Sequence, residues 1–140
     1  MNYNNYKKMT TTELGRYGED IAVKYLRDKG FRILERNFRY SHRELDIIAD
    51  DATNLIFVEV KARTNHNNEL YHYKHRPGDA VNLTKQRFII SAARHYMRTH
   101  DTHHKYPRLD VIEIYFSPYQ RFGKPVIERV HHIENAFWPH

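Results

Sequence analysis

Three charged residues stand inside apolar segments of this chain: Asp46 in "LDIIA", and Glu59 and Lys61 in "LIFVEVKAR". Charged side chains are depleted from strands, and burying a charge is costly unless it is paired or bound to a metal. Successive side chains of a strand point to opposite faces, so Glu59 and Lys61 share one face, roughly 7 Å apart. Two acids on consecutive strands, with a lysine beside the second acid, therefore indicate a site.

Carboxylates held close together repel each other unless a cation lies between them. Hard divalent ions such as Mg²⁺ prefer oxygen ligands and bind through one or two carboxylates. An ion held by Asp46 and Glu59 would polarise a phosphodiester, and Lys61 would orient the attacking water or neutralise charge at phosphorus. This pattern predicts metal-assisted phosphodiester hydrolysis. The simpler alternative is a Glu59–Lys61 ion pair on an exposed edge strand, which the apolar residues on both faces of the strand disfavour.

Further polar residues are candidates by position. Glu19 lies at the edge of the apolar stripe of the first predicted helix and could supply a third acid, and Gly15 and Gly18 would let that helix approach the sheet closely. Lys85 and Arg87 open the second predicted helix, where positive charge is unfavourable to the helix dipole, so phosphate is a candidate neighbour and a solvated helix start is the alternative. Three more residues are candidate phosphate contacts: Arg63, Lys74 and Arg76.

The elements that would position these residues follow from periodicity. Apolar residues at helical spacing predict a helix over 13–30, opened by a capping box of Thr10 and Glu13 and closed at Gly30. The other predicted elements are strands from Phe31, from Glu44 and over 55–63, a long loop over 64–80, a helix over 83–98, a strand from Leu109 and a candidate final strand from Pro125. The order αβββαβ, with the candidate final strand, predicts an α/β fold with a sheet flanked by helices.

Composition limits the class of protein. The chain has 140 residues, no cysteine and a formal net charge of +6. We expect one domain over 13–140 after a flexible segment over 1–12. Without a membrane-spanning run or a signal-peptide pattern, we expect a cytoplasmic protein with no membrane contact. The basic excess favours a polyanionic partner such as nucleic acid, with a solvated basic surface as the alternative.

The absence of cysteine excludes disulfides and thiolate chemistry. The eleven histidines raise the question of zinc, for example at His103 and His104. No histidine pair has a nearby carboxylate at a recognisable zinc spacing, so we do not expect a zinc site.

Five sequence blocks carry a resemblance. In chain order they are "GRYGEDIAVKYLRDKGFRILERNFR", "ELDIIA", "FVEVKAR", "AVNLTKQR" and "LDVI". Together, over about residues 13–115, they resemble the YraN-like family of uncharacterised bacterial proteins. The "ELD" and "FVEVKAR" blocks are similar to the D…(D/E)-x-K signature of the PD-(D/E)XK nuclease superfamily, to which restriction endonucleases and archaeal Holliday junction resolvases belong.

The resemblance implies a restriction-endonuclease-like fold with a central mixed β-sheet flanked by helices. It implies Asp46 and Glu59 as metal ligands, Lys61 as the catalytic lysine and Glu19 as an accessory acid. It also implies that Lys85 and Gln86 point toward the same cleft. Two features depart from the family pattern: Arg43 stands where a glycine is usual, and the loop over 64–80 is longer and richer in histidine.

The function expected from these residues and the resemblance is a Mg²⁺-dependent DNA endonuclease, with Mn²⁺ able to substitute. Its expected substrate is branched or otherwise structured DNA, and no small-molecule cofactor is expected. A homodimer stays open, because symmetric cleavage of a junction needs two active sites. The main alternative is a non-catalytic nucleic-acid-binding adaptor with the same fold in DNA repair, recombination or uptake. A protein-interaction subunit without a DNA role is the third.

Overall fold

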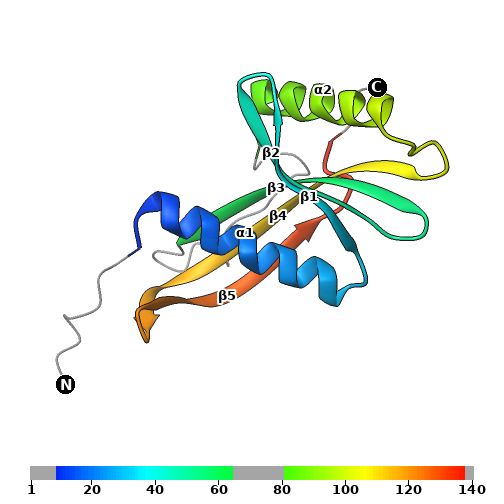
Figure 1. Ribbon diagram of the computed structural model, residues 1–140. Coiled ribbons are helices and arrows are strands. Elements are labelled where there is room, and N and C mark those ends of the chain that lie inside the picture. Colours follow the sequence, from blue (N-terminus) through cyan, green and yellow to red (C-terminus); the bar gives the residue numbers. More distant parts are fainter. Residues whose placement is uncertain (1–8, 65–80, 138–140) are drawn as a thin grey trace.

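The computed structural model describes residues 9–64 and 81–137, in which a five-stranded mixed sheet has a helix on each face (Figure 1). The elements are α1 (Thr11–Asp28), β1 (Arg32–Tyr40), β2 (Arg43–Asp50), β3 (Asn54–Thr64), α2 (Leu83–Thr99), β4 (Tyr106–Arg121) and β5 (Lys124–Ile133). The predicted α/β fold with a mixed sheet is confirmed, and the candidate final strand is present as β5.

The strands lie side by side in chain order, from β1 to β5. All neighbours are antiparallel except β3 and β4, which are parallel. Parallel neighbours need a crossover connection, and α2 lies in the segment that joins them. No helix of the described ranges is long and apolar enough to cross a membrane.

The capping box and the glycine predicted at the two ends of α1 are both present, although the helix itself spans Thr11–Asp28. The Thr10 hydroxyl accepts a hydrogen bond from the backbone N–H of Glu13 at 3.1 Å, and the Glu13 carboxylate accepts one from the N–H of Thr10 at 3.2 Å. Gly30 follows the helix with a φ of +95°, the left-handed conformation that suits glycine. Thr11 and Thr12, predicted to belong to a flexible N-terminal segment, instead form the first turn of the helix.

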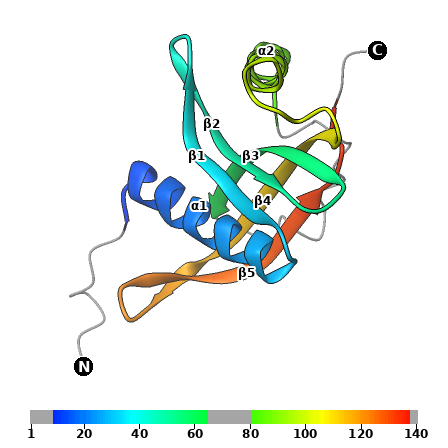
Figure 2. The same cartoon turned by 45° about the vertical axis from the view of Figure 1, so that its right-hand side comes forward.

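The sheet separates two apolar cores, one beneath each helix (Figure 2). Alternate residues of β3 divide between them: Ile56 and Val58 pack in the core of α1, and Leu55 and Phe57 in the core of α2. β3 is therefore an interior strand covered on both faces. Glu59 itself is buried, which argues against the alternative of an exposed ion pair with Lys61 on an edge strand.

Gly18 lies where α1 comes closest to the sheet. A Cβ at this position would lie 2.8 Å from the Cβ of Ala62 on β3, closer than carbon atoms approach without a shift. Ala62 has no rotatable side chain with which to move aside. Gly15 has nothing within 4 Å of an added Cβ, so the prediction of a close approach is confirmed for Gly18 and wrong for Gly15.

These two glycines give matched variants with opposite expected effects. We expect Gly18→Ala to lower the free energy of unfolding by about 1–3 kcal/mol, because it overpacks the contact with Ala62. We expect Gly15→Ala to raise it by up to about 1 kcal/mol, because alanine is the better helix former. Urea unfolding of both variants measures the difference, and a Gly18→Ala protein as stable as Gly15→Ala would contradict the close approach.

Candidate active site

β2 and β3 separate at the point where the two predicted acids lie. Regular pairing between these strands ends at Ile47 and Val58. Beyond that pair the backbone N–H of Val60 donates to Oδ2 of Asp46 at 2.8 Å. A side-chain carboxylate thus takes the place of a backbone carbonyl as the acceptor on β2. This bond fixes the Asp46 carboxylate beside Glu59, the residue before Val60.

Burial disfavours the charged forms of both acids, and the charge of Asp46 adds to this effect at Glu59. The Glu59 side chain is 5% exposed, and burial, together with the neighbouring charge of Asp46, raises the pKa of Glu59 to about 8. Burial likewise raises the pKa of Asp46, against the opposing effects of the Val60 N–H and of Lys85. The two carboxyl groups are close enough to share a proton.

Two lysines approach the same oxygen of Glu59 from different elements. Nζ of Lys61, from β3, lies 3.8 Å from Oε1, and Nζ of Lys85, from the first turn of α2, lies 3.6 Å from it. The other oxygen, Oε2, is buried and has no hydrogen-bond partner among the described residues. A buried carboxylate oxygen left without a donor is costly.

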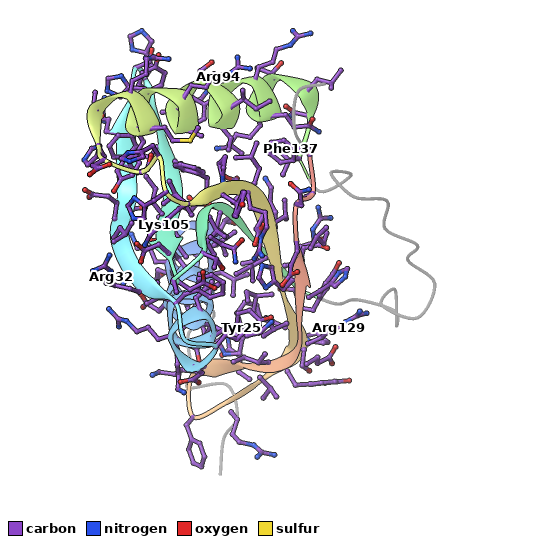
Figure 3. All side chains as sticks on the ribbon, turned by 90° about the vertical axis from the view of Figure 1, so that its right-hand side faces the viewer. Tyr25, Arg32, Arg94, Lys105, Arg129 and Phe137 are labelled. Atoms are coloured by element: carbon purple, nitrogen blue, oxygen red, sulfur yellow. The ribbon has the colours of Figure 1, made fainter. Side chains whose placement is uncertain are left out.

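The other buried acids on the sheet strands differ from Glu59 because both of their oxygens have partners. Asp50 accepts from Arg32 and Lys105, both labelled in Figure 3. The hydroxyl of Tyr115 donates to Oε2 of Glu113 at 3.0 Å, and Nδ1 of His131 lies 3.2 Å from its Oε1. Among the buried side chains of the described ranges, Glu59 is thus the exception.

Asp110, on β4, is a buried acid that the sequence did not single out. It accepts from Arg108, from Nε2 of His132 at 2.7 Å and from the backbone N–H of Asn135 at 2.9 Å. Burial raises its pKa, but the bonds from His132 and Arg108 outweigh this effect and hold the pKa below its usual value. Tyr25 of α1 (Figure 3) extends the network, with its hydroxyl 3.1 Å from Nδ1 of His132. This network joins α1, β4 and the end of β5.

Glu19 reaches the acids from α1. Its side chain is 11% exposed, and its pKa is raised mainly by burial and secondly by the charge of Asp46, so Glu19 and Asp46 are electrostatic neighbours. Nε of Arg36 on β1 donates to Oε1 of Glu19 at 3.3 Å, and its Nη2 donates to Asp20 at 2.6 Å. Arg36 was missed in the sequence, where it is one of several arginines in a polar stretch of strand.

The predicted nucleic-acid contacts are only partly brought to the site. Lys85 lies there, as described above. Gln86 donates to the backbone carbonyl of Val81 at 2.8 Å, a bond within the start of α2, and Arg87 is exposed. Lys74 and Arg76 lie outside the described residues.

Arg63 lies at the end of β3, beyond the site. Its side chain is 42% exposed, and its Nε is 3.8 Å from Oε2 of the buried Glu113 on the neighbouring strand. Glu113, another residue missed in the sequence, is the register partner of Lys61 on β4. Its carboxylate therefore holds the exposed Arg63 guanidinium close to Lys61.

A further cluster lies on the surface between α2 and β4. Asp101, His103 and His104 bring one ligand atom each within 4.8 Å of one another, and Nδ1 of His103 lies 2.6 Å from Oδ1 of Asp101. A carboxylate thus lies beside this histidine pair, although the sequence has no recognisable zinc spacing there. All three residues are exposed, and such a surface cluster does not by itself indicate a metal site.

Residues 18–114, more than half of the chain, match the sequence model of a family described as "Uncharacterised protein family UPF0102". The chain belongs to family UPF0102. It is 40% identical over 131 residues to a UPF0102 protein of Caldanaerobacter subterraneus, covering 94% of this chain and 99% of that protein. It is 44% identical over 131 residues to a UPF0102 protein of Chlorobium chlorochromatii, covering 92% and 94%.

A third UPF0102 protein, from Clostridioides difficile, is 38% identical over 129 residues, covering 92% of this chain and all of the relative. The predicted resemblance to the YraN-like family is thereby confirmed. The part that matches the UPF0102 model includes Glu19, Asp46, Glu59, Lys61 and Lys85. The family description assigns no activity, so the geometry of the site has to support the functional argument.

Proposed function

We propose that this UPF0102 protein is a divalent-metal-dependent endonuclease that hydrolyses phosphodiester bonds of DNA. The observation that carries the proposal is the meeting of Asp46, Glu59 and Lys61 where β2 and β3 separate, with Oε2 of Glu59 unpaired among the described residues. A buried acid beside a second, partly buried acid is costly unless a cation shares them. The lone pairs of Oε2 are directed at no described donor, as expected of a ligand atom.

The donor set fits a hard cation. Asp46 and Glu59 would hold the ion, and both offer only oxygen, which favours Mg²⁺ and allows Mn²⁺. When bound, such an ion polarises the scissile phosphodiester and lowers the pKa of a coordinated water. Glu19, held by Arg36, adds a third carboxylate beside Asp46.

Two lysines are suited to the phosphate. The side chains of Lys61 and Lys85 are 37% and 26% exposed, so both ammonium groups lie between the buried Glu59 and solvent. A substrate phosphate entering from solvent would meet these charges first, and they would neutralise charge that develops at phosphorus. The net charge of +6 and the exposed Arg63 and Arg87 favour a long polyanion over a small phosphoester.

A cleavage assay tests the proposal. The substrates are labelled four-way junction, flap, linear duplex and single-stranded DNA, each with Mg²⁺, Mn²⁺ or EDTA, beside the Asp46→Asn variant. We expect cutting that requires the metal, disappears in the variant and is strongest on a branched substrate. Salt-dependent binding of these DNAs without metal-dependent cutting would instead support the non-catalytic adaptor.

Lys61→Ala is expected to slow single-turnover cleavage by about 10²–10³-fold, the usual effect of removing one group that stabilises transition-state charge. Because lysine is not a ligand, Mg²⁺ affinity measured by calorimetry should change little. Lys24→Ala is the matched control, since Lys24 is an exposed lysine that pairs with Asp28 on α1. A Lys61→Ala enzyme with the wild-type rate would remove Lys61 from the mechanism.

A further inference from the structure

The β4–β5 hairpin extends beyond the rest of the sheet. Within the described residues, the last pair between β3 and β4 is Thr64 with Phe116. Further along, Arg121 of β4 pairs with Lys124 of β5, and the two strands form a ribbon that projects at the lower left of Figures 1 and 2. A two-stranded ribbon has little core of its own, so its exposed residues are not selected by packing.

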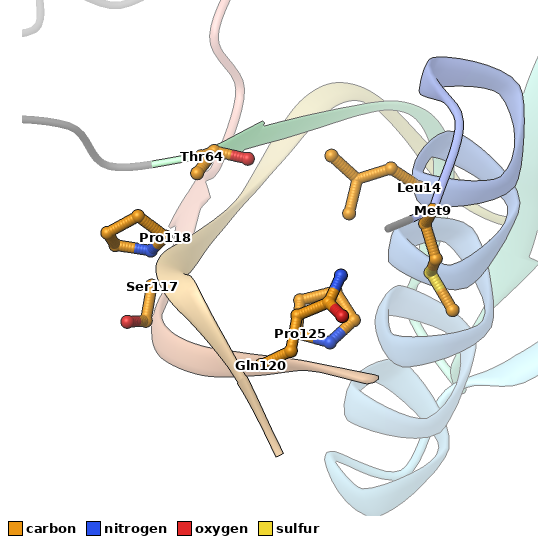
Figure 4. A pocket seen from close by; sticks show the side chains of 7 residues that line it. All are labelled: Met9, Leu14, Thr64, Ser117, Pro118, Gln120 and Pro125. Atoms are coloured by element: carbon orange, nitrogen blue, oxygen red, sulfur yellow. The ribbon is translucent and has the colours of Figure 1, made fainter. Parts of the chain in front are cut away.

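α1 supports the base of the hairpin. Tyr17 stacks on Phe116 with ring centres 5.7 Å apart, and Nζ of Lys124 lies 5.7 Å from the centre of the Tyr17 ring. A groove of about 200 Å³ lies between the hairpin and the start of α1 (Figure 4). Its lining residues all have uncharged side chains: Met9, Leu14, Thr64, Ser117, Pro118, Gln120 and Pro125. α1 therefore contacts the hairpin at Phe116, near its base, and through the side chain of Lys124, beside the turn, while Phe122 in the turn projects.

The turn at the tip contains an unusual residue. Phe122 and Gly123 both have positive φ, 54° and 76°, the pattern of a type I′ turn, which favours Asn-Gly. A bulky residue with positive φ is an outlier. The other non-glycine residues with positive φ in the described ranges are small and polar: Asn37, Ser41 and Asn135.

Packing does not explain this phenylalanine either. Phe122 is 84% exposed, and Tyr119, on the same hairpin, is 77% exposed. Arg121 and Lys124, also exposed, flank the turn on either side. The tip thus presents two aromatic rings and the Arg121 side chain to solvent, and the exposed Lys124 beside them reaches the Tyr17 ring of α1. Neither the backbone nor the core favours phenylalanine at this position.

This combination suits nucleic acid. Bases stack on aromatic side chains, and arginine and lysine contact the adjoining phosphates. Within a regular duplex the bases are already stacked on each other, so a projecting ring gains most where bases are unpaired or a step is opened. A symmetric contact between two hairpin tips is disfavoured, since Arg121 and Lys124 would meet their own copies.

The hairpin and the acids lie toward the same end of the sheet. Because β3 and β4 are parallel, Glu59 lies level with Val111, and β4 continues in the same direction to the turn. At about 3.3 Å per residue, the strand from Val111 to Phe122 spans at most about 36 Å. One turn of duplex DNA is about 34–36 Å long, so one DNA molecule can contact both places.

We propose that the β4–β5 hairpin stacks on unpaired bases of a nucleic acid through Phe122, with Arg121 and Lys124 on the adjoining phosphates. This inference rests on the proposed function, because it takes nucleic acid as the substrate. Stacking of Phe122 on unpaired bases would make the protein prefer a branched or opened substrate over regular duplex.

Phe122→Asn is the decisive variant, since it removes the ring and creates the favoured Asn-Gly turn. Binding is measured in EDTA, without cleavage, on a four-way junction that carries 2-aminopurine at the branch point. We expect Phe122→Asn to bind about tenfold more weakly and to lose the fluorescence change caused by the wild type, with unchanged or higher thermal stability. Phe122→Trp should keep both signals. Tyr106→Thr, which removes a 75% exposed ring at the opposite end of β4, is the matched control and should behave as wild type.

Several results would overturn the inference. The first is a Phe122→Asn protein with the affinity and fluorescence change of the wild type. The second is a wild-type protein that does not bind the junction. The third is a wild-type dimer that the Phe122→Asn substitution converts to a monomer. The last result would make the tip a protein contact. The inference and the nuclease proposal fail separately: stacking without metal-dependent cleavage refutes only the nuclease, and Glu59-dependent cleavage with a normal Phe122→Asn protein refutes only the role of the hairpin.

Discussion

The Glu59→Gln variant is expected to lose metal-dependent DNA cleavage by at least about a thousandfold, because it removes the charge of a proposed metal ligand while keeping the shape of the side chain. An amide offers one neutral oxygen in place of two that share a negative charge. The apparent Mg²⁺ affinity should fall with the rate, which distinguishes this variant from Lys61→Ala. Single-turnover cleavage over a range of Mg²⁺ concentrations measures both quantities.

The matched control is Glu134→Gln, the same change in a half-exposed glutamate that lies 3.7 Å from Arg108. It should cut at the wild-type rate. DNA binding in EDTA should survive in Glu59→Gln, since the lysines and arginines are intact. Normal cleavage by Glu59→Gln would refute the metal site proposed at the separation of β2 and β3.

The second large effect concerns stability without metal. The pKa of Glu59 rises from its ordinary value of 4.5 to about 8 on folding, so the folded protein binds a proton that the unfolded chain releases. The corresponding stability is fully present below about pH 4.5 and is lost as the pH rises toward 8. At pH 7 the loss amounts to about 3 kcal/mol, from about 1.4 kcal/mol per pKa unit. Mg²⁺ should reduce the loss, because it binds the ionised carboxylates.

Urea unfolding between pH 5 and 8 in EDTA, with and without excess Mg²⁺, measures this effect. The difference between wild type and Glu59→Gln isolates the acid pair from other groups that titrate in the same range, and Glu59→Gln should be the more stable protein at pH 8 in EDTA. Asp50 and Asp110 have lowered pKa values, so their contributions are lost only as the pH falls below about 4. Parallel stability curves for the two proteins would contradict the buried acid pair.

Much of the fold follows from local patterns in the sequence. Helical periodicity and the capping box place α1, and alternation places the strands, because these signals lie within single elements. The ends of elements depend on partners. β4 continues to Arg121 because it pairs with β5, which no pattern within "LDVIEIYF" indicates.

Charged residues within apolar strands predict the candidate site, but this pattern does not distinguish an unpaired acid from a paired one. Asp110 and Glu113 carry the same signal in "LDVIEIYF". They differ from Glu59 in their partners. Asp110 is bonded by His132, and Glu113 by Tyr115 and His131, and both histidines come from the distant strand β5. Sequence alone reveals that a buried acid exists, but only the tertiary contacts reveal which acid lacks a partner.

The hydrogen bond from the Val60 N–H gives Asp46 a structural role in addition to its proposed catalytic one. Asp46 joins two strands as well as facing the proposed ion, so a descendant that abandoned catalysis would keep it, or replace it with asparagine, to preserve the sheet. Glu59 has an oxygen without a described partner, and burial raises its pKa, so we expect it to destabilise the metal-free fold at neutral pH. Without catalysis, its ion pairs with Lys61 and Lys85 are the described contacts that would still favour keeping it. Under the proposed nuclease function, the residue at position 59 is therefore the one expected to report on activity, and the residue at position 46 mainly on the fold.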